Sequence, residues 1–351
     1  MTGEQAENVR MLRDSVAAVA PGGGSLARIR ALRFGLPGID RTVWQQMAGM
    51  GWLGLLVPEG QGGAGLGMVE GCALAEALAE GLTPEPLVPC AAIARLLPRD
   101  VLDGVLSGAC IVLPAWQEAA DTMQPGAGTA AAGGRVNGRK LFVPMAAAAD
   151  LFLVAAGSAL VLVEAGARGL VLETAQTQDG GHFGTLTLDG APCRPVEGAL
   201  ADAIEAATLL TAAGLLGVME RSFALTLDYL RTRKQFGRAI GSFQALQHRA
   251  ADLKLQIALT RASVEGAAAL LDREADPARR RAAVSRAKAR AASAAILVTR
   301  EAVQMHGGIG YTDEYDVGLY LRRAMVMANQ FGSARLHRAR FAATMPEVSD
   351  D

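Results

Sequence analysis

The strongest constraint on the fold is a change of pattern in the middle of the chain. Between about residues 110 and 198, short apolar runs alternate with turn signals. Strands this short and this closely spaced favour an antiparallel sheet or barrel over units in which strands alternate with helices. The runs are residues 110–113, 151–154, 160–163, 169–172 and 186–188, and the turn signals are Gly133-Gly134, Asn137-Gly138, Asp179-Gly180-Gly181 and Asp189-Gly190.

Helical spacing dominates on both sides of this block. Before it, an Ala/Leu-rich stretch carries Leu74, Leu78 and Leu82 at four-residue intervals. After it, apolar residues recur at intervals of three or four, which places them on one face of a long helix. These residues are Leu216, Met219, Phe223, Leu227 and Leu230.

Local signals set the expected helix ends. Asp202 and Glu205 have the spacing of a capping box at the start of the long helix. Asp276-Pro277 breaks a second helix and opens a third. The first 35 residues or so, interrupted by Pro21-Gly22-Gly23-Gly24, are expected to be poorly ordered or loosely attached.

We therefore expect a mostly α protein with a central β domain. A chain of 351 residues is long for a single core and suggests two or three domains. The pattern predicts an N-terminal helical domain over residues 1–109, a middle β domain over 110–200 and a C-terminal helical bundle over 201–351.

Charge and composition limit the classes of function. The formal charge of −1 predicts no general attraction to nucleic acid or to an anionic membrane. A basic run, Arg279-Arg280-Arg281 with Arg286, Lys288 and Arg290, lies among alanines at helical spacing, and we expect a solvated helix face there. The four cysteines are far apart and form no CxxC pair, which indicates neither a zinc site nor disulfides but free thiols in a reducing cytoplasm.

Targeting and membrane signals are not visible in the sequence. The first residues lack the basic and apolar regions of a signal peptide. The longest apolar stretch, residues 151–163, is too short to span a bilayer. We expect a soluble cytoplasmic protein without a metal centre.

Gly60-x-Gly62-x-x-Gly65 matches the dinucleotide-binding fingerprint. However, Pro58-Glu59 separates it from the preceding apolar run, and the chain that follows never alternates strands with helices as that fold requires. The motif is better interpreted as a glycine-rich loop between helices.

Two segments of the C-terminal third are suited to binding an anionic aromatic ligand. In the first, residues 229–247, Arg233 can offer a positive fork to a pyrophosphate, and Phe236 or Phe243 can lie flat against an adenine. In the second, residues 304–315, the adjacent Gly307 and Gly308 let backbone N–H groups approach an anion. No Lys-Ser/Thr follows them, which excludes a Walker-type loop.

In this order and about 70 residues apart, the two segments closely resemble the signature of the acyl-CoA dehydrogenase family. Weaker support comes from residues 51–65, which resemble a loop of the family's N-terminal domain. Asn137-Gly138-Arg139-Lys140 resembles the turn before its flavin-facing strand. The resemblance covers about residues 45–345 and implies an N-terminal helical domain, a middle antiparallel β-barrel or sheet and a C-terminal four-helix bundle.

The resemblance also implies an activity. Family members oxidise an acyl-CoA thioester to its 2-enoyl form in fatty acid metabolism, with hydride passing to FAD and on to an electron-transfer flavoprotein. They form dimers or tetramers in which one subunit contacts the ADP half of an FAD whose flavin is held by its neighbour. Carried over to this chain, the cofactor-binding residues are Arg233, Gln235, Phe236, Phe243, Gln244, Gln247, Gln304, Gly307, Gly308 and Thr312.

The family's catalytic base is missing from both of its usual positions. The reaction needs a carboxylate to accept the α-proton. The turn that carries this glutamate in most members reads Gln330-Phe331-Gly332 here, and the alternative position is Ala207. Glu205 lies two residues from Ala207, about 200° around the helix, and is better interpreted as part of the capping box with Asp202.

The flavin-facing elements also depart from the family pattern. Gln117-Glu118-Ala119 replaces the family's TEPxxGSD segment, and Phe142-Val143-Pro144-Met145 replaces its W-I-T/S-N strand. Pro144 removes a hydroxyl and a backbone N–H from the expected flavin contacts. Glu118 occupies a position that in the family usually caps a turn.

Three interpretations follow. The chain is an acyl-CoA dehydrogenase acting alone with an unrecognised base, Glu205 or Glu118; or a non-catalytic subunit that completes the FAD site of a glutamate-bearing partner in a hetero-oligomer; or a relative with altered flavin chemistry. Phe331 and Ala207 argue against the first interpretation. The intact ADP-side motifs argue against a scaffold that has abandoned flavin.

Overall fold

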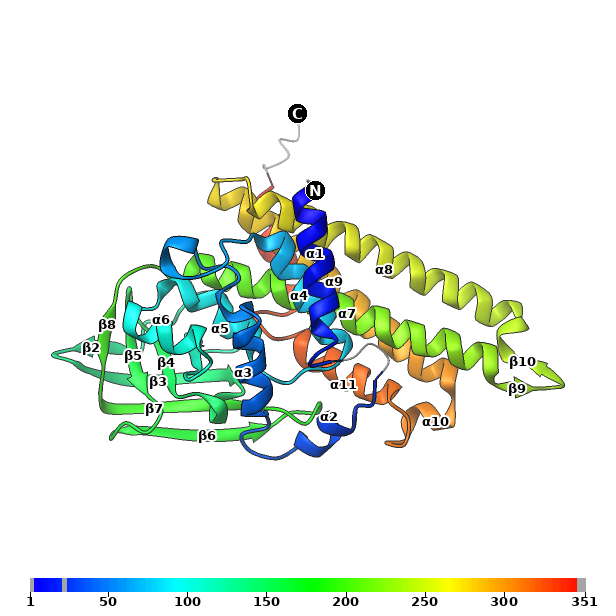
Figure 1. Ribbon diagram of the computed structural model, residues 1–351, viewed down its shortest axis with the longest axis horizontal. Helices are drawn as coiled ribbons and strands as arrows, with labels where there is room; N and C mark the ends of the chain where they lie inside the picture. The colour runs from blue at the N-terminus through cyan, green and yellow to red at the C-terminus, as the bar shows by residue number, and fades with distance from the viewer. Residues whose placement is uncertain (1–2, 21–23, 346–351) are drawn as a thin grey trace. The chain divides into compact units, whose positions relative to one another are not determined.

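The computed structural model describes residues 3–20 and 24–345 (Figure 1). The chain forms two compact units, each discontinuous in sequence. The helical unit comprises Met1–Asp14, Met68–Leu82 and Thr208–Asp351, and the mixed unit comprises Ser15–Gly67 and Thr83–Ala207. The predicted order of helices, strands and helices is confirmed, while the domain bounds at 109/110 and 200/201 stay a prediction.

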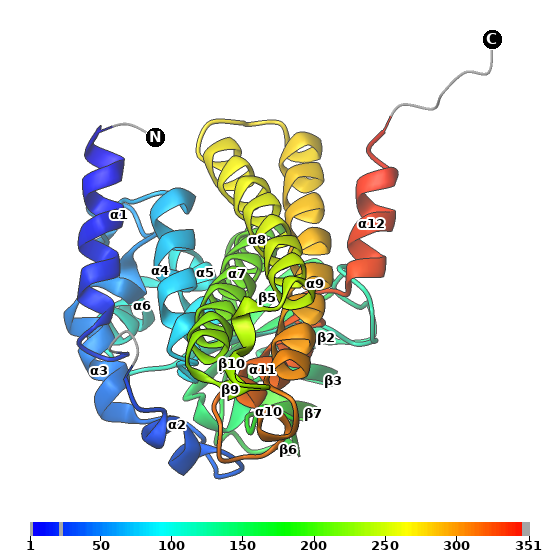
Figure 2. The ribbon, with the colours of Figure 1, turned by 90° about the vertical axis from the view of Figure 1, so that its right-hand side faces the viewer.

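The helical unit is organised around three long helices, which Figure 2 shows with their neighbours. The apolar stripe predicted for the first of them is confirmed, since Leu216, Met219, Phe223 and Leu230 are buried and Leu227 is half-buried. The elements are α1 (Gly3–Val16), α4 (Met68–Glu80), α7 (Ala201–Thr232), β9 (Lys234–Gln235), β10 (Arg238–Ala239), α8 (Gln244–Leu271), α9 (Pro277–His306), α10 (Gly308–Tyr311), α11 (Val317–Met327) and α12 (Ala334–Ala342).

Helices α8 and α9 pack against each other, and α9 also contacts α11 and α12 (Figure 2). The break at Asp276-Pro277 is confirmed. The Asp276 carboxylate accepts a hydrogen bond from the Ala278 N–H at 2.9 Å, and Pro277 takes the first helical position, where no N–H is needed. Helix α7 is long and apolar enough to cross a membrane, but 83% of its most apolar window is buried within the protein, as in a core helix.

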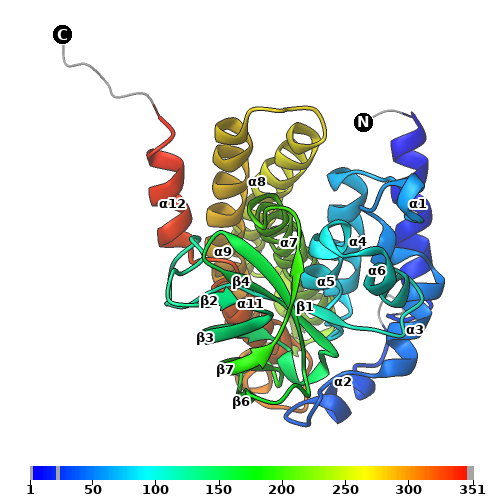
Figure 3. The ribbon, with the colours of Figure 1, turned by 90° about the vertical axis from the view of Figure 1, so that its left-hand side faces the viewer.

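The mixed unit contains two four-stranded sheets and four α-helices (Figures 1 and 3). One sheet has the order β1-β4-β5-β8 and the other the order β2-β3-β7-β6. The helices are α2 (Ala27–Leu32), α3 (Arg41–Gly49), α5 (Leu87–Ile93) and α6 (Arg99–Leu106). The strands are β1 (Val112–Ala115), β2 (Ala130–Ala132), β3 (Arg135–Pro144), β4 (Leu151–Ala156), β5 (Ala159–Glu164), β6 (Leu170–Gln176), β7 (His182–Pro192) and β8 (Arg194–Val196).

Two strand-level predictions were wrong. Strands β1 and β4 pair in parallel, because the chain crosses to the other sheet and back between them. Asn137-Gly138 and Asp189-Gly190 lie inside β3 and β7 instead of forming turns. They form an irregularity in this ladder: the register shifts between Val136 and Gly138, and the Asn137 side chain accepts from the Gly190 N–H at 2.8 Å.

The glycine-rich motif at residues 60–65 forms a loop between α3 and α4, as predicted. Gly62 and Gly65 have φ angles of 85° and 62°, which favour glycine. A Cβ on Gly63 would lie 2.1 Å from the Val57 carbonyl oxygen. The glycines therefore allow backbone segments to approach each other closely in this loop.

The expectation of a loosely attached N-terminus was wrong for the described residues, while 21–23 lie outside them. Helix α1 is tied to α4 by an Arg13–Glu76 ion pair at 3.0 Å. In the mixed unit, Arg28 donates to both carboxylate oxygens of Glu85, at 2.7 and 3.3 Å. The sequence offered only the glycine break and no sign of these long-range pairs.

The solvated face predicted for the basic run was partly wrong. Arg279, Arg281 and Arg286 are exposed, but Lys288 is fully buried. The α9 face that carries Lys288 points toward α11 and the turn that follows it, where backbone carbonyls accept its hydrogen bonds.

Close packing of α7 on α4 yields a stability prediction. A Cβ on Gly217 would lie 2.0 Å from the Glu76 carbonyl oxygen, whereas a Cβ on Gly266, exposed in α8, meets nothing within 4 Å. We expect Gly217→Ala to lower the free energy of unfolding by about 1–3 kcal/mol through overpacking. Gly266→Ala, the matched control, should raise it by up to about 1 kcal/mol. Urea unfolding followed by circular dichroism measures both, and equal effects would contradict this packing.

Candidate cofactor-binding surface and catalytic turn

The hairpin after α7 presents an aromatic and basic surface. Phe236 and Gly237 have φ angles of 54° and 79°, and they form the turn that joins β9 to β10. The Phe236 side chain is 91% exposed and meets Phe243 edge to face, with ring centroids 6.2 Å apart. The Arg238 guanidinium lies over the Phe243 ring at 4.2 Å.

The polar residues predicted beside this hairpin are also exposed. Arg233 follows the last turn of α7, with its N–H bonded to the Tyr229 carbonyl at 2.8 Å. Gln235 lies in β9 and Gln244 begins α8, while the Gln247 side chain donates to the Gly241 carbonyl at 3.0 Å. These side chains face outward and are available to a ligand or to another chain.

The second predicted segment begins where α9 ends. Gly307 has φ 66° and ψ −142°, a conformation that favours glycine. A Cβ on Gly307 or Gly308 would meet no atom within 4 Å, so packing inside the described chain does not require glycine at position 308. Gln304 and Thr312 are exposed beside them, and the Thr312 hydroxyl donates to the Ile309 carbonyl at 2.9 Å.

A stack of three rings brings the two segments together. His306, which closes α9, stacks on Tyr229 from α7 with ring centroids 4.5 Å apart, and Tyr315 lies 4.8 Å from His306 on another side. The His306 Nδ1 contacts the Ala302 carbonyl at 2.7 Å, and burial lowers the pKa of His306. Its buried Nε2 has no hydrogen-bond partner among the described residues.

These features fit the ADP half of a dinucleotide cofactor. An exposed guanidinium can pair with a pyrophosphate, an exposed phenyl ring can cover an adenine, and glycine N–H groups can approach an anion. The sequence predicted these residues but gave no role to His306 or Tyr315. Their aromatic character inside the motif was the available signal. That the ten predicted residues contact FAD stays a prediction.

The predicted base position lies in the turn between α11 and α12 of the helical unit. Phe331 has φ 55° and is 4% exposed, and its carbonyl is 2.8 Å from the Nε2 of His337. Ala207, the alternative position, is buried in the part of α7 that belongs to the mixed unit. Neither side chain contains an atom that accepts a proton.

The capping box predicted for Asp202 and Glu205 was wrong in position. Helix α7 begins at Ala201, so Asp202 lies inside the first turn and not at the cap. Its carboxylate is 3.7 Å from Arg95. The Leu200 carbonyl already accepts from the Ile204 N–H, which places the helix cap two residues earlier than the sequence suggested.

Glu118 is a structural carboxylate. It accepts hydrogen bonds from Lys140 at 2.6 Å and from the N–H groups of Gly128 and Thr129 at 2.8 and 3.0 Å. Burial alone would raise the pKa of Glu118, but these hydrogen bonds and the Lys140 charge lower it to about 2. A carboxylate this acidic is a poor proton acceptor, so Glu118 is unsuited to be the base.

The strand expected to face a flavin is irregular and apolar. Phe142 and Met145 have φ angles of 58° and 53°, and the β3–β7 register shifts between Lys140 and Val143. The Phe142 ring is partly exposed and meets Phe183 edge to face, with centroids 6.3 Å apart. Pro144 in the same stretch removes one backbone N–H and offers no hydroxyl, so the strand has fewer donors for a flavin edge than the family pattern provides.

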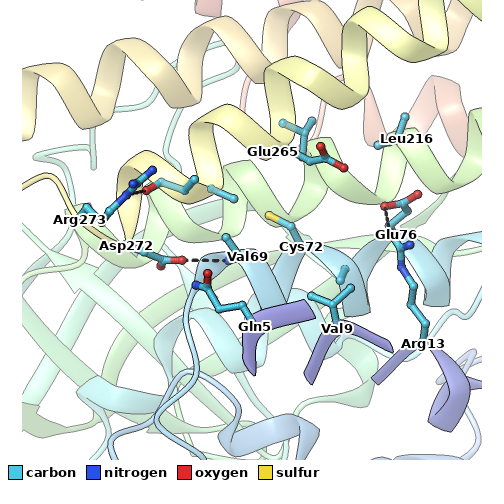
Figure 4. Close-up of a pocket in the computed structure, with 14 residues that line it drawn as sticks. Gln5, Val9, Arg13, Val69, Cys72, Glu76, Leu216, Glu265, Asp272 and Arg273 are labelled. Carbon is cyan, nitrogen blue, oxygen red and sulfur yellow. Dashed lines mark hydrogen bonds and ion pairs between the residues drawn. The ribbon is translucent and has the colours of Figure 1, made fainter. Parts of the chain in front are cut away.

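A separate cavity of about 430 Å³ lies in the helical unit (Figure 4). Its middle is lined by small apolar residues such as Cys72 and Val264. The polar groups at its two ends are already paired: Glu76 with Arg13, and Asp272 with the Val69 N–H at 3.2 Å. None of the predicted site residues lines this cavity.

Within residues 3–20 and 24–345, no three His, Cys, Asp or Glu side chains gather in a group that could hold a metal ion. The helix–strand–helix order of the chain and its exposed aromatic and basic surface are the combination that the sequence resemblance to a class of flavoprotein dehydrogenases predicts.

Comparisons with known proteins identify the family within this class. A sequence model of the acyl-CoA dehydrogenase C-terminal domain matches residues 199–345, and the N-terminal domain model matches residues 6–95. Acyl-CoA dehydrogenase IpdE2 of Mycolicibacterium smegmatis is 32% identical over 96% of this chain and 98% of its own length. Acyl-CoA dehydrogenase FadE27 of Mycobacterium tuberculosis is 32% identical over 88% of this chain and 89% of its own.

Solved structures agree. A variant of the steroid ACAD Tcur3481-Tcur3483 has a TM-score of 0.87 and 31% identity, with 97% of each chain covered. The ChsE4-ChsE5 complex from Mycobacterium tuberculosis gives a TM-score of 0.86 and 29% identity, covering 99% of this chain and 98% of that one. The chain belongs to the acyl-CoA dehydrogenase family, whose members are FAD-dependent oxidoreductases.

The structural role of Glu118 can be tested in the mixed unit, which contains all three tryptophans. We expect Glu118→Gln to lower the free energy of unfolding by about 3–5 kcal/mol, because fully buried Lys140 loses its counter-charge. Urea unfolding at pH 7, followed by tryptophan fluorescence, measures this change. Glu164→Gln, at an exposed position of β5, should change stability by less than about 0.5 kcal/mol.

The same variant should alter acid stability. The folded-state pKa of Glu118 is about 2 against an ordinary value of 4.5. Its stabilising contribution is therefore present above pH 4.5 and is lost as the pH falls from 4.5 toward 2. Glu118→Gln should remove this part of the acid dependence, and an unchanged profile would show that the pair does not set it.

Proposed function

We propose that this chain is the non-catalytic subunit of a heteromeric acyl-CoA dehydrogenase and completes the FAD site of a glutamate-bearing partner. One contrast supports this. The exposed surface suited to ADP is complete, from Arg233 to Gln247 and from Gln304 to Thr312. The base position nevertheless holds Phe331, a buried phenylalanine. If another chain moves the proton, a subunit still needs the surface suited to ADP but does not need a catalytic base.

In this proposal the residues of this chain bind and orient, and they transfer no proton. Arg233 pairs with the pyrophosphate, Phe236 or Phe243 covers the adenine, and the N–H groups of Gly307 and Gly308 approach phosphate oxygens. FAD, when bound, accepts the hydride that leaves Cβ of the acyl-CoA thioester. The partner's glutamate takes the α-proton, so that the substrate loses one hydride and one proton and becomes the 2-enoyl thioester.

The solved relatives support a two-component assembly. Both are named as pairs of proteins, Tcur3481-Tcur3483 and ChsE4-ChsE5, and the first is called a steroid ACAD. By extension, the partner of this chain is a homologue of similar fold. The family resemblance leads us to propose an electron-transfer flavoprotein as the electron acceptor, and the unpaired, widely spaced cysteines lead us to propose a cytoplasmic location.

The second candidate function is acyl-CoA dehydrogenation by a homo-oligomer of this chain. It is favoured by the names of the curated relatives, since IpdE2 and FadE27 are both called acyl-CoA dehydrogenases and match nearly their whole lengths. It requires a catalytic base elsewhere in the chain, because the two base positions hold Phe331 and Ala207 and because Glu118 is too acidic.

Purification of the full chain alone and together with a glutamate-bearing homologue, sought in an adjacent reading frame, separates the two functions. The heteromer proposal predicts little bound flavin and no acyl-CoA turnover for the lone chain. It predicts a yellow, active complex after co-expression. Stoichiometric FAD with turnover by the lone chain would overturn the proposal and establish the second function.

Arg233→Ala should weaken FAD retention without unfolding the chain, because a charge-assisted phosphate contact is worth about 1.5–3 kcal/mol. This corresponds to roughly a 10- to 150-fold rise in the FAD dissociation constant. Arg231→Ala is the matched control, since Arg231 is also exposed, two residues away, but pairs with Asp228 at 3.4 Å. Titration of the apo-complex with FAD provides the measurement, and equal constants for both variants would count against the role of Arg233.

A further inference from the structure

Lys288 is a buried cation at the turn that holds Phe331. Its side chain is fully buried in α9, and its Nζ donates to three main-chain carbonyls: Met327 at 3.2 Å, Ala328 at 2.9 Å and Gly332 at 3.0 Å. The first two carbonyls terminate α11, and the third lies beyond Phe331. One amine therefore joins both sides of the turn.

The turn itself is strained. Phe331 has φ 55° and Gly332 has φ 98°, and a phenylalanine rarely adopts the left-handed region. Such a conformation has an energetic cost and persists only where the surroundings hold it. Two side chains hold it here: Lys288 donates a hydrogen bond to the Gly332 carbonyl, and His337 from α12 donates one to the Phe331 carbonyl.

The hydrogen-bonding pattern suits an ammonium group. Three carbonyl acceptors match the three N–H donors of protonated lysine, whereas a neutral amine keeps only two donors. Burial opposes the charge and lowers the pKa of Lys288 to about 7. Among the described residues, no carboxylate forms an ion pair with Lys288.

Several charged groups on the neighbouring helices have partners away from this turn. On α12, Arg338 donates to Ser293 at 2.7 Å. On α11, Arg322 pairs with Asp313. On α9, Arg290 donates to Gln256 on α8. His337 on α12 is a titratable group that shares the turn with Lys288, since it contacts the Phe331 carbonyl and Ser285. The other cations on α11 and α12 are Arg323, Arg335 and Arg340.

We propose that Lys288 is a positioning residue that sets the left-handed turn from Asn329 to Gly332 and fixes the direction of the side chain at position 331. The proposal rests on the proposed function in one respect: that function identifies this turn as the family's base position. The clamp, meaning the three hydrogen bonds from Lys288 to the carbonyls on both sides of the turn, is independent of FAD and of any partner. This chain has a device that orients residue 331 although the phenylalanine there carries no carboxylate.

The clamp makes two pH effects of opposite sign. As the pH rises through about 7, folded Lys288 loses a proton and one carbonyl of the turn loses its donor, so the turn loosens locally. Unfolded lysine keeps its proton up to an ordinary pKa of 10.5. The unfolded state therefore binds more protons than the folded state between pH 7 and 10.5, and global stability gains from Lys288 as the pH rises across that window.

Hydrogen exchange of the full chain measures the local effect. The relevant amides are those of Asn329 and Gln330, which donate to the Val326 carbonyl at the end of α11, and that of Gly332, which donates to the Asn329 carbonyl. After correction for intrinsic rates, we expect their protection to fall two- to tenfold between pH 6 and pH 8.5, the equivalent of one net hydrogen bond. Low protection of these amides at both pH values in the unmodified chain would overturn the proposal, because the hydrogen bonds from Lys288 predict an ordered turn. High protection that does not change with pH would support a lysine that holds the turn and stays charged. This measurement needs no variant to fold.

Lys288→Met, which keeps the stem and removes the donors, tests the cause. We expect low protection of the turn at every pH, unchanged protection of α7, and loss of the gain in global stability between pH 7 and 10. Lys254→Met is the control, since Lys254 is exposed in α8 and should leave both profiles as they were. Turn protection in Lys288→Met equal to that of the unmodified chain would refute the positioning role, whether or not the heteromer proposal holds.

Discussion

One guanidinium connects most of the helical unit. Arg261 on α8 pairs with Glu76 on α4 and, at 3.0 Å, with Glu220 on α7, and Glu76 also accepts from Arg13 on α1. The Glu76 side chain is 8% exposed, so its charge is stable there only because two cations surround it. This network explains how segments as distant in sequence as 3–14, 68–82 and 208–345 share one unit.

Some of this architecture follows from local sequence rules. The spacing from Leu216 to Leu230 determines which face of α7 is buried, and Asp276-Pro277 determines where α9 begins, because periodicity and capping act within a few residues. The parallel pairing of β1 with β4 does not follow, since it depends on where the chain returns after crossing to another sheet. The Arg13–Glu76 pair was equally hidden, because neither residue has a local signal for a partner 63 positions away.

The candidate site shows the same limit. Motif spacing singled out Arg233, Phe236 and Gly307, and the structure leaves all three exposed. The stacking of His306 on Tyr229, which joins the two motifs, is a tertiary contact that no spacing rule predicts. The sequence pattern gave a wrong prediction for Lys288, because a lysine among exposed arginines suggests a solvated helix face. Only the position of the carbonyls that end α11 explains its burial.

The features that are present and absent at the site distinguish two explanations: general decay of the chain, or absence of the catalytic groups alone. If the chain had simply decayed, a strained, buried turn would be among the first features to relax, because a left-handed phenylalanine has an energetic cost and gains nothing locally. Instead Phe331 is held from both sides by Lys288 and His337, and its side chain is 4% exposed. The departures from the family pattern lie at the two base positions and in the flavin-facing segments around Glu118 and Pro144, while the residues suited to ADP are present. A difference of this kind fits the proposed subunit, which would still have to present the correct shape to a cofactor or a partner without moving a proton. In that proposal the turn at Phe331 fills space at the position where another member of the family would carry its base.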